Sequence, residues 1–289
     1  MLLQQKNNHA DNSYDAHVHT LLGTKKGRPC FELSIGVHLD PGIRRKNRPN
    51  EDTVLVTHGV LPSASSLPKS FVLLIVADGM GGQGYGQEAS QLAARSLAEY
   101  VSGRLSSQQS LPENLLPLLT AGVQYANRVV YERNRQQQTV MGTTMTVALV
   151  SETTAYIAHV GDSRLYLYRA STGLAQITRD HSVVAELVAE GIIAPNDIYT
   201  HPMRNQIYRS LGENADVEVD ASVVPLAAGD VLLLCSDGLW EMVRDQQIAA
   251  IMTTRMPTPS DSAQALIQAA LAGGGEDNVS AIVAQVSNV

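Results

Sequence analysis

Two runs of apolar residues in this chain each lead into an aspartate followed by a glycine. Residues 71–77 (FVLLIVA) precede Asp78, and residues 231–235 (VLLLC) precede a serine and then Asp237. Continuous apolar runs of this length, rich in branched side chains, predict strands that are buried on both faces. A carboxylate at the end of such a strand is costly to bury unless a cation or a hydrogen-bond donor meets it. The fold must therefore let each aspartate either cap a turn or bind a cation.

Acidic residues recur at three more places where a strand is expected to begin or end. Glu51 and Asp52 precede a strand, Asp162 lies in a tight turn between two strands, and Asp277 lies between a helix and the last strand. Turn chemistry explains a single aspartate of this kind, but six carboxylates gathered in one place cannot all stay ionised without cations. Ligand sets made of oxygen alone favour Mg²⁺ or Mn²⁺ over zinc. Two such ions about 3.5–4 Å apart would clamp a phosphoryl group and activate a bridging water.

The remaining pattern predicts one layered α+β domain. Helices are expected in two pairs rather than one after each strand, which favours antiparallel sheets over a doubly wound parallel sheet. Residues 180–215 begin as a helix and then become irregular, and the polar residues 1–30 predict a flexible N-terminal tail. The expected helices cover residues 86–101, 115–135, 245–252 and 261–272, and the expected strands cover residues 33–38, 53–57, 71–77, 142–150, 155–160, 164–170, 217–223, 231–236 and 279–286.

Composition and charge argue against several classes of partner. The 289 residues carry a formal net charge of −7 and no long basic run, which argues against nucleic acid. Two cysteines, Cys30 and Cys235, are too few for a disulfide framework or a four-thiolate zinc site. No apolar run approaches the roughly 18 residues that span a bilayer. The N-terminus lacks the pattern of a signal peptide, so we expect a cytoplasmic protein that binds no membrane.

Eight short motifs occur in the order found in metal-dependent protein phosphatases of the PPM (type 2C) family, which this chain resembles from about residue 33 to residue 287. The motifs are RPNED, VADGMGG, GTTM, VGDSR, TRDHS, HPMRNQIYRSLG, SDGLW and EDNVS. The DGMGG form, with Met80, looks like the bacterial branch. The resemblance implies a four-layer α-β-β-α sandwich, in which a helix pair covers each of two antiparallel sheets. It also implies one catalytic domain over residues 31–289, with residues 180–215 as a flap beside the site.

The resemblance implies roles for the acidic residues around two metal ions. Asp78 would bridge both ions, and the Gly79 carbonyl would bind one of them. Asp237 and Asp277 would complete the shell of the first ion, and Glu51 would bind the second. The hydroxide between the ions would attack the phosphorus of phosphoserine or phosphothreonine in line, without a covalent phosphoenzyme.

Further residues of the motifs would support this centre. Asp52 would hold water of the second ion, and Asn278 would lie behind the ligands. Asp162, together with Asp237, resembles the ligands of a third, weaker ion described for bacterial members. Met80 stands where many eukaryotic relatives have a histidine proposed as the general acid. Because methionine cannot donate a proton, the leaving group must take its proton from a metal-bound water or from elsewhere.

The phosphate-binding arginine of the family has three candidate counterparts. Arg44, Arg45 and Arg48 all stand shortly before the Glu-Asp pair, and we predict Arg48 because it is nearest. An arginine is favoured there because its planar fork binds phosphate oxygens bidentately. In the flap we expect three substrate contacts, unless its arginines only pair with nearby acids. These contacts are Arg204, Asn205 and Arg209.

Two other functions are weaker hypotheses. Gly79, Gly81 and Gly84 match the dinucleotide-binding pattern G-x-G-x-x-G, but Asp78 would point its charge at the pyrophosphate, and Glu99 falls inside a helix. A pseudophosphatase, which would bind phosphoproteins without hydrolysing them, is disfavoured because every carboxylate position is filled. We therefore predict a monomeric serine/threonine phosphatase that acts on phosphorylated proteins, with a cognate serine/threonine kinase as a further partner.

Overall fold

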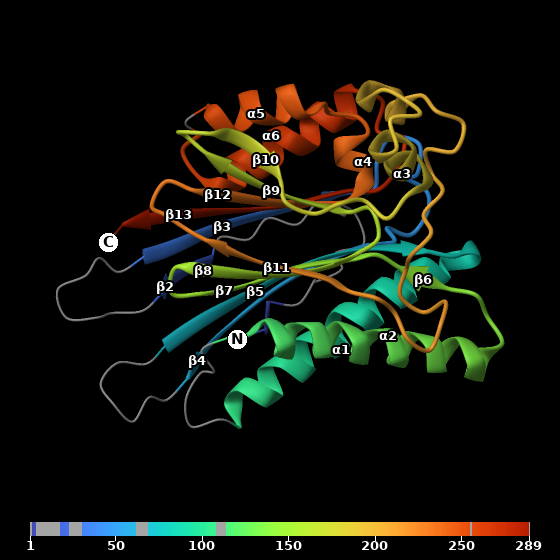
Figure 1. The fold of residues 1–289 in the computed structure, drawn as a ribbon, viewed down its shortest axis with the longest axis horizontal. Coiled ribbons are helices and arrows are strands. Elements are labelled where there is room, and N and C mark those ends of the chain that lie inside the picture. Colours follow the sequence, from blue (N-terminus) through green and yellow to red (C-terminus); the bar gives the residue numbers. More distant parts are fainter. Residues whose placement is uncertain are drawn as a thin grey trace.

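The computed structural model describes residues 2–3, 18–22, 31–61, 69–107, 114–254 and 256–288. Two antiparallel β-sheets pack face to face, and a pair of helices covers the outer face of each sheet (Figure 1). One pair is α1 (Tyr85–Ser106) and α2 (Leu116–Gln137), and the other is α5 (Asp245–Thr253) and α6 (Pro259–Ala272). The predicted α+β fold, a four-layer α-β-β-α sandwich, is confirmed.

The first sheet has the strand order β1-β4-β5-β7-β8-β11, and the short β6 pairs with the end of β5. Helices α1 and α2 pack on this sheet. Its strands are β1 (Leu2–Leu3), β4 (Asp52–Leu61), β5 (Lys69–Met80), β6 (Gly142–Thr143), β7 (Met145–Ser151), β8 (Thr154–Val160) and β11 (Asp220–Pro225).

The second sheet has the order β10-β9-β12-β13-β3-β2, and α5 and α6 pack on it. Every strand pairing in the described part of the chain is antiparallel, so the dinucleotide-binding alternative, which needs a parallel sheet, is wrong. The strands are β2 (Val18–Leu22), β3 (Phe31–Asp40), β9 (Arg164–Arg169), β10 (Gly173–Gln176), β12 (Val231–Cys235) and β13 (Val279–Asn288).

The two apolar runs of the sequence form central strands whose side chains alternate between two cores. In β5, Leu73 and Ile75 pack against α1 and α2, whereas Val72 and Leu74 pack between the two sheets. In β12, Leu232 and Leu234 likewise enter the core between the sheets, and their neighbours pack against α5 and α6. Burial on both faces therefore explains why these strands carry no polar residue until they reach their ends.

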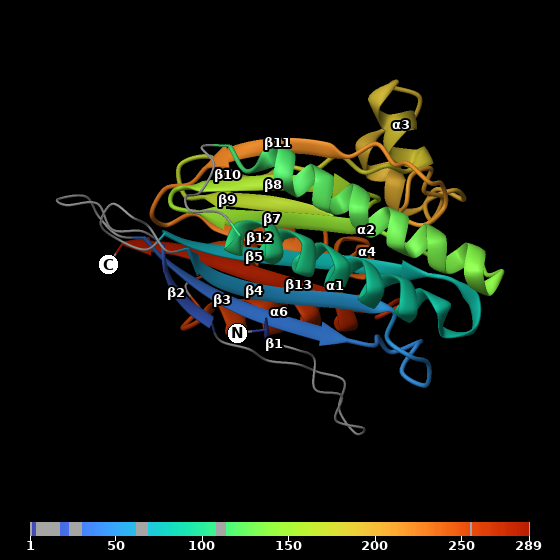
Figure 2. The same ribbon diagram turned by 90° about the horizontal axis from the view of Figure 1, so that it is seen from below.

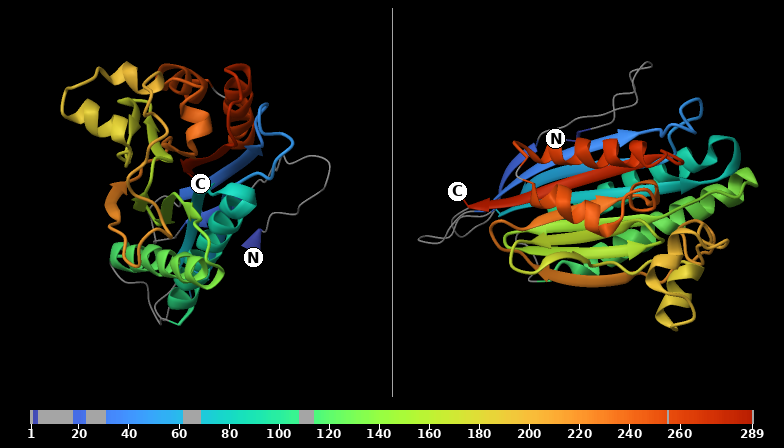
Figure 3. Two further views of the ribbon diagram at one scale, coloured as in Figure 1. Left: turned by 90° about the vertical axis from the view of Figure 1, so that its right-hand side faces the viewer. Right: turned by 90° about the horizontal axis from the view of Figure 1, so that it is seen from above.

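Residues 180–215, which we call the flap segment, stand out at one end of the sandwich (Figures 2 and 3). They contain α3 (Val183–Ala189) and a 3₁₀ helix, η2 (Pro195–Tyr199), and are otherwise irregular. The bridge between Ser182 and Ile207 closes the base of the segment, and two contacts join that base to the sandwich: Leu211 pairs with Thr143 of β6, and the His181 N–H donates to the Gly161 carbonyl at 2.7 Å. The predicted excursion thus has its base anchored beside the ends of the central strands.

The remaining differences from the expected elements are short. The sequence pattern did not predict β10, which forms a hairpin with β9, or the one-turn helix α4 (Asp237–Trp240). The expected tail contributes β1 and β2, which pair with β4 and β3, and the rest of residues 1–30 lies outside the described residues. Among the residues that the structure describes, no helix combines the length and apolar character needed to cross a bilayer.

Candidate metal centre

Strand direction brings the predicted carboxylates to one end of the sandwich. β4 and β13 begin there and β5 and β12 end there, while the turn at residues 161–163 crosses there from β8 to β9. These strand ends surround a cavity of about 350 Å³, which we call the acidic hollow. Its polar lining comprises Arg45, Glu51, Asp78, Thr144, Asp162, Arg204, Asn205, Asp237, Glu241, Glu276 and Asp277, together with the glycines at 79 and 81.

Asp52 and Asp78 face each other across the β4–β5 pair. They are direct partners in the strand register, and Asp52 is only 1% exposed beneath the hollow. Directly opposed residues lie about 4.5–5.5 Å apart and like charges at that separation repel. One oxygen of Asp52 accepts a hydrogen bond from the Ser236 hydroxyl at 2.6 Å, but Oδ1 has no partner among the described residues. The same is true of Oδ1 of Asp237.

Burial and mutual repulsion both raise the pKa values of these aspartates. Burial, and then the charges of Asp237 and Asp277, raises the pKa of Asp52 to about 7. Burial, and then the charge of Asp277, raises the pKa of Asp237 to about 6. The pKa values of Asp78 and Asp162 rise well above the ordinary range, again through burial first and neighbouring carboxylates second. The centre therefore holds oxygen ligands whose ionised form lacks a sufficient counter-charge.

Backbone contacts hold Asp78 in place. Its N–H donates to the Thr144 hydroxyl at 2.9 Å, and its carbonyl accepts from the Thr144 N–H and the Thr143 hydroxyl, both at 2.9 Å. Thr143 and Thr144 of the GTT motif thus hold the backbone of Asp78 through both its N–H and its carbonyl. This clamp fixes the direction of the carboxylate without using the carboxylate's own oxygens.

A glycine follows each strand-end aspartate because another backbone segment passes too close for a side chain. A Cβ on Gly79 would lie 1.9 Å from the Gly86 carbonyl oxygen at the start of α1. A Cβ on Gly238 would lie 2.1 Å from the carbonyl oxygen of Asn278. The repeated Asp-Gly pattern of the sequence therefore records the convergence of separate segments on one point.

Asn278 joins two of the predicted ligands. Its Oδ1 accepts from the Glu51 N–H at 2.8 Å, its own N–H donates to Asp277 Oδ1 at 2.6 Å, and its Nδ2 donates to the Pro41 carbonyl at 2.9 Å. It is 2% exposed. The side chain therefore lies behind the carboxylates, where the sequence placed it, and fixes β4 relative to the turn before β13.

Two side chains hold the turn that carries Asp162. The indole Nε1 of Trp240 donates to the Asp162 carbonyl at 3.0 Å, and Nδ1 of His181 accepts from the Gly161 N–H at 3.0 Å. His181 in turn contacts Arg209 and Asp220. The TRDHS motif therefore supports the turn from the base of the flap segment.

An arginine lies among the carboxylates. Arg45 forms ion pairs with Glu51 and with Asp277, two residues that the chain separates by more than 220 positions. Arg48, which we predicted as the phosphate-binding residue, is exposed on the loop and does not line the hollow. The loop turns at Arg45, whose carbonyl accepts from the Arg48 N–H at 2.8 Å, so the arginine that is farther from Glu51 in sequence is the one that contacts it.

Of the three predicted flap residues, two line the hollow and one does not. Arg204 and Asn205 line the hollow, and Arg204 lies 3.8–3.9 Å from carboxylate oxygens of Glu241 and Glu276. Arg209 does not line it, because it pairs with Glu218 and Asp220 outside. Both arginines therefore have acidic neighbours, as the alternative expected, but only the partners of Arg204 line the hollow.

Sequence reasoning missed Glu241. It follows Asp237 by four residues, so α4 presents both carboxylates on one face, and Glu241 lines the hollow. Burial, and then the charge of Asp237, raises its pKa to about 7. The i, i+4 spacing of Asp237 and Glu241 in SDGLWE could have revealed this residue. That spacing is informative only if a helical turn is expected directly after the strand.

The donor set fits hard divalent cations. All candidate ligands are oxygens, including the Gly79 carbonyl, and two of the buried carboxylates have an unpartnered oxygen. The described side chains are not arranged as a ready group of three ligands around one point. The Arg45 guanidinium lies between Glu51 and Asp277 instead. A cation that binds these two carboxylates must therefore displace the guanidinium.

Comparison with known proteins shows which family builds such a site. The sequence profile of protein phosphatase 2C matches residues 41–273. The chain belongs to the protein phosphatase 2C family. The serine/threonine phosphatase stp of Listeria monocytogenes is 38% identical over 215 residues, which cover 74% of this chain and 84% of that protein. The prediction of a metal-dependent phosphatase of this family, with bacterial relatives, is thus confirmed.

Solved structures of the family share the fold of this chain. The serine/threonine phosphatase Stp1 of Staphylococcus aureus superposes with a TM-score of 0.76 at 32% identity, covering 93% of this chain and 98% of that one. The catalytic domain of the phosphatase PstP in complex with two manganese ions gives a TM-score of 0.72 at 34% identity, covering 89% and 99%. A relative with this fold therefore holds two manganese ions.

The raised pKa values make the stability of the metal-free protein depend on pH. Asp52 and Asp237 bind protons more tightly when folded, so folding takes up protons between the ordinary Asp pKa of 3.8 and about 7. The contribution of these groups to the free energy of unfolding is therefore fully present below about pH 3.8 and is lost as pH rises through about 6–7. Urea unfolding in chelator across this range should show the decline. Saturating Mn²⁺ should reverse it, because the ion binds the ionised carboxylates. Metal-free stability that rises from about pH 5 to 7.5 contradicts this account.

The position of Arg45 predicts competition with metal. In Arg45→Gln the metal-free protein should lose about 1–3 kcal/mol of stability, since the buried Glu51 carboxylate and the half-exposed Asp277 carboxylate lose their counter-ion. Mn²⁺ should bind roughly fivefold more tightly, because no guanidinium has to leave. Thermal unfolding in chelator and calorimetric Mn²⁺ titration measure the two effects. Arg95→Gln, on the exposed face of α1, makes the same change of charge and should alter neither. Weaker Mn²⁺ binding by Arg45→Gln would refute the competition.

Proposed function

We propose that this chain hydrolyses phosphoserine and phosphothreonine in proteins, using two divalent ions bound in the acidic hollow. The observation that carries the proposal is the convergence of six carboxylates from five separate segments on one end of the sandwich, with unpartnered buried oxygens on two of them. The names of the relatives, serine/threonine phosphatases, support the substrate class. Phosphorylated proteins, and a kinase that phosphorylates them, would be the partners.

Each predicted ligand has a place in this proposal. Asp78 would lie between the two ions, with the Gly79 carbonyl, Asp237 and Asp277 on one side and Glu51 on the other. When bound, two Mn²⁺ or Mg²⁺ ions would supply Lewis-acid charge and a bridging water whose attack on phosphorus needs no covalent phosphoenzyme. Their binding sites are oxygen-rich and carry the negative charge that such ions need.

Two of the aspartates would have separate tasks. Asp52 would hold water beside the ions, because its carboxylate lies beneath the hollow and one oxygen is already bonded to Ser236. Asp162, which lines the hollow from the turn between the sheets, would bind a third and weaker ion together with Asp237. Asn278 would keep Glu51 and Asp277 in register.

The substrate phosphate would be received by Arg45 rather than by Arg48. Once cations neutralise Glu51 and Asp277, the Arg45 guanidinium is free inside the hollow, whereas Arg48 points to solvent. Arg204 and Asn205 line the same cavity from the flap segment and would contact the residues that flank the phosphorylated one. Met80 lines the hollow but has no proton to donate.

Removing the bridging carboxylate tests the metal centre. Asp78→Asn should lower Mn²⁺-dependent hydrolysis of an aryl phosphate by about a hundredfold or more, because one neutral amide cannot join two cations. Asp216→Asn, at an aspartate whose side chain is 85% exposed, is the matched control and should be fully active. A wild-type protein that binds phosphopeptides but does not hydrolyse them with Mn²⁺ would favour the pseudophosphatase alternative instead.

Removing Asp162 tests the third site. Calorimetry on Asp162→Asn should still show two bound Mn²⁺ ions per chain with affinities close to wild type, while the turnover number falls at least about tenfold. The reason is that Asp162 lines the hollow from a separate segment, the turn that joins the sheets, and would bind only the third ion. If the variant loses one of the two tight ions, Asp162 belongs to the main centre and the assignment is wrong.

A further inference from the structure

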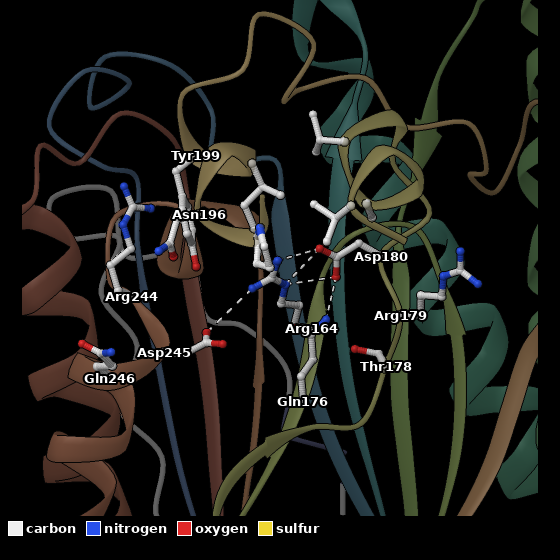
Figure 4. Close-up of a pocket in the computed structure, with 15 residues that line it drawn as sticks. Arg164, Gln176, Thr178, Arg179, Asp180, Asn196, Tyr199, Arg244, Asp245 and Gln246 are labelled. Carbon is white, nitrogen blue, oxygen red and sulfur yellow. Dashed lines mark hydrogen bonds and ion pairs between the residues drawn. The ribbon is translucent and has the colours of Figure 1, made fainter. Parts of the chain in front are cut away.

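A second and larger cavity lies next to the acidic hollow. Its volume is about 770 Å³, and it shares no lining residue with the hollow. The flap segment forms one wall, the start of α5 forms another, and β9 and β10 lie at its floor (Figure 4). We call it the flap cavity.

The floor of the flap cavity is a closed polar network. Arg164 and Asp180, both almost fully buried, form a forked ion pair with distances of 2.6–3.1 Å. Gln176 donates to the same Asp180, and Arg164 donates to the Tyr166 hydroxyl, which donates to Asp245 at 3.0 Å. The charges of Arg164 and Asp180 are therefore satisfied internally, and this network gives the cavity a rigid base.

The rim carries a cation that has no acidic partner. The Arg244 guanidinium stacks 3.3 Å from the centre of the Tyr199 ring, and its Nη1 donates to the Glu241 carbonyl at 2.9 Å. Among the described residues these are the two contacts of the guanidinium, and neither brings it a negative charge. Stacking and the carbonyl contact hold the planar group still and leave its other edge open. A guanidinium held in this way is prepared to bind a carboxylate with two parallel hydrogen bonds.

Arg244 is the arginine of this cavity whose charge has no acidic partner in the described part of the chain. Three arginines and two aspartates line the cavity, and Arg164 pairs with Asp180. Arg179 pairs with Glu186 at 3.0 Å, and Asp245 accepts a hydrogen bond from the Tyr166 hydroxyl. Figure 4 shows Arg179 and Arg244 on opposite sides of the cavity. Among the described residues, the Arg244 guanidinium is therefore the charge that remains for an incoming carboxylate.

The two cavities are within reach of one extended peptide. Three short segments each contribute one residue to each of the two cavities. Asp162, Arg204 and Glu241 line the acidic hollow, and Arg164, Tyr199 and Arg244, which lie two to five positions away in the chain, line the flap cavity. Two residues span at most about 7 Å and three at most about 11 Å. A substrate whose phosphorylated residue lies in the hollow can thus place a side chain in the flap cavity within a few residues.

We propose that the flap cavity is a docking subsite for an acidic side chain of the phosphoprotein substrate, several residues from the phosphorylated one, and that Arg244 receives its carboxylate. The inference rests on the proposed function, whose specificity it refines. The apolar wall of Val184, Val188 and Ile198 suits the methylene groups of such a side chain, while its charge reaches the rim.

Trp240 offers a direct test of occupancy. It is the single tryptophan of the chain, its ring lies 3.6 Å from the Arg164 guanidinium at the cavity floor, and 6.3 Å from the Tyr199 ring. With the full chain saturated with Mn²⁺, an unphosphorylated peptide rich in glutamate should shift the tryptophan emission. The midpoint should rise about fivefold in Arg244→Gln and stay unchanged in Arg95→Gln. No shift with the wild type, or the same midpoint in Arg244→Gln, overturns the proposal.

Kinetics on paired phosphopeptides tests the effect on specificity. A phosphoserine peptide with glutamate placed two to six residues to either side is compared with its alanine counterpart. At one or more positions the wild type should favour glutamate by about fivefold in kcat/KM, through KM. Arg244→Gln should abolish that preference, Arg244→Lys should retain part of it, and both should hydrolyse an aryl phosphate at the wild-type rate. A preference that survives in Arg244→Gln, or is absent at every position, contradicts the assignment.

The two proposals fail separately. If the wild type hydrolyses neither aryl phosphate nor any phosphopeptide with Mn²⁺, the proposed function is wrong. The fluorescence titration still decides whether the flap cavity binds acidic peptides. If hydrolysis is normal but Arg244 has no effect in either experiment, the docking subsite alone is wrong.

Discussion

Mutual repulsion of carboxylates at one end of the sandwich is the constraint on which the rest of this structure depends. Asp52 and Asp78 are forced together by strand register, and Asp162, Asp237 and Asp277 meet them from other segments. The strand ends cannot move apart to relieve this repulsion, because the apolar runs that precede the aspartates are buried in the cores. Three apolar layers therefore supply the free energy that keeps a strongly acidic site assembled.

The remaining parts of the site hold the carboxylates without neutralising them. Threonine side chains clamp the backbone of Asp78, Asn278 joins two loops, and Trp240 holds the turn of Asp162. Arg45 pairs with Glu51 and Asp277, and Arg204 lies near Glu241 and Glu276, but two guanidinium groups cannot balance all the acids of the hollow. A site built in this way has a deficit of positive charge, which two divalent ions would fill. The manganese-bound relative with the same fold supports that interpretation.

Trp240 also connects the acidic hollow with the flap cavity. Its indole nitrogen bonds to the Asp162 carbonyl, while its ring carries the Arg164 guanidinium. The flap segment packs on the same ring through Tyr199. A movement of the flap segment would therefore shift Trp240, which is hydrogen-bonded to the turn that carries Asp162. Trp240 would thus contact both the metal centre and the cavity proposed to recognise the substrate.

The sequence by itself determined the elements and the acidic residues, because both are recorded in local patterns. Apolar runs of strand length, helices in two pairs and Asp-Gly at strand ends can each be recognised in a window of about ten residues. Tertiary structure alone decided which arginine enters the hollow. Arg45 and not Arg48 lies there, because the loop folds back on Glu51 and Asp277. It also placed Glu241 in the hollow, paired Arg209 with acids outside, and left Arg244 at the rim without an acidic partner in the described part of the chain. Long, flexible arginine and glutamate side chains reach well away from their backbone, so their partners depend on neighbours that are distant in sequence.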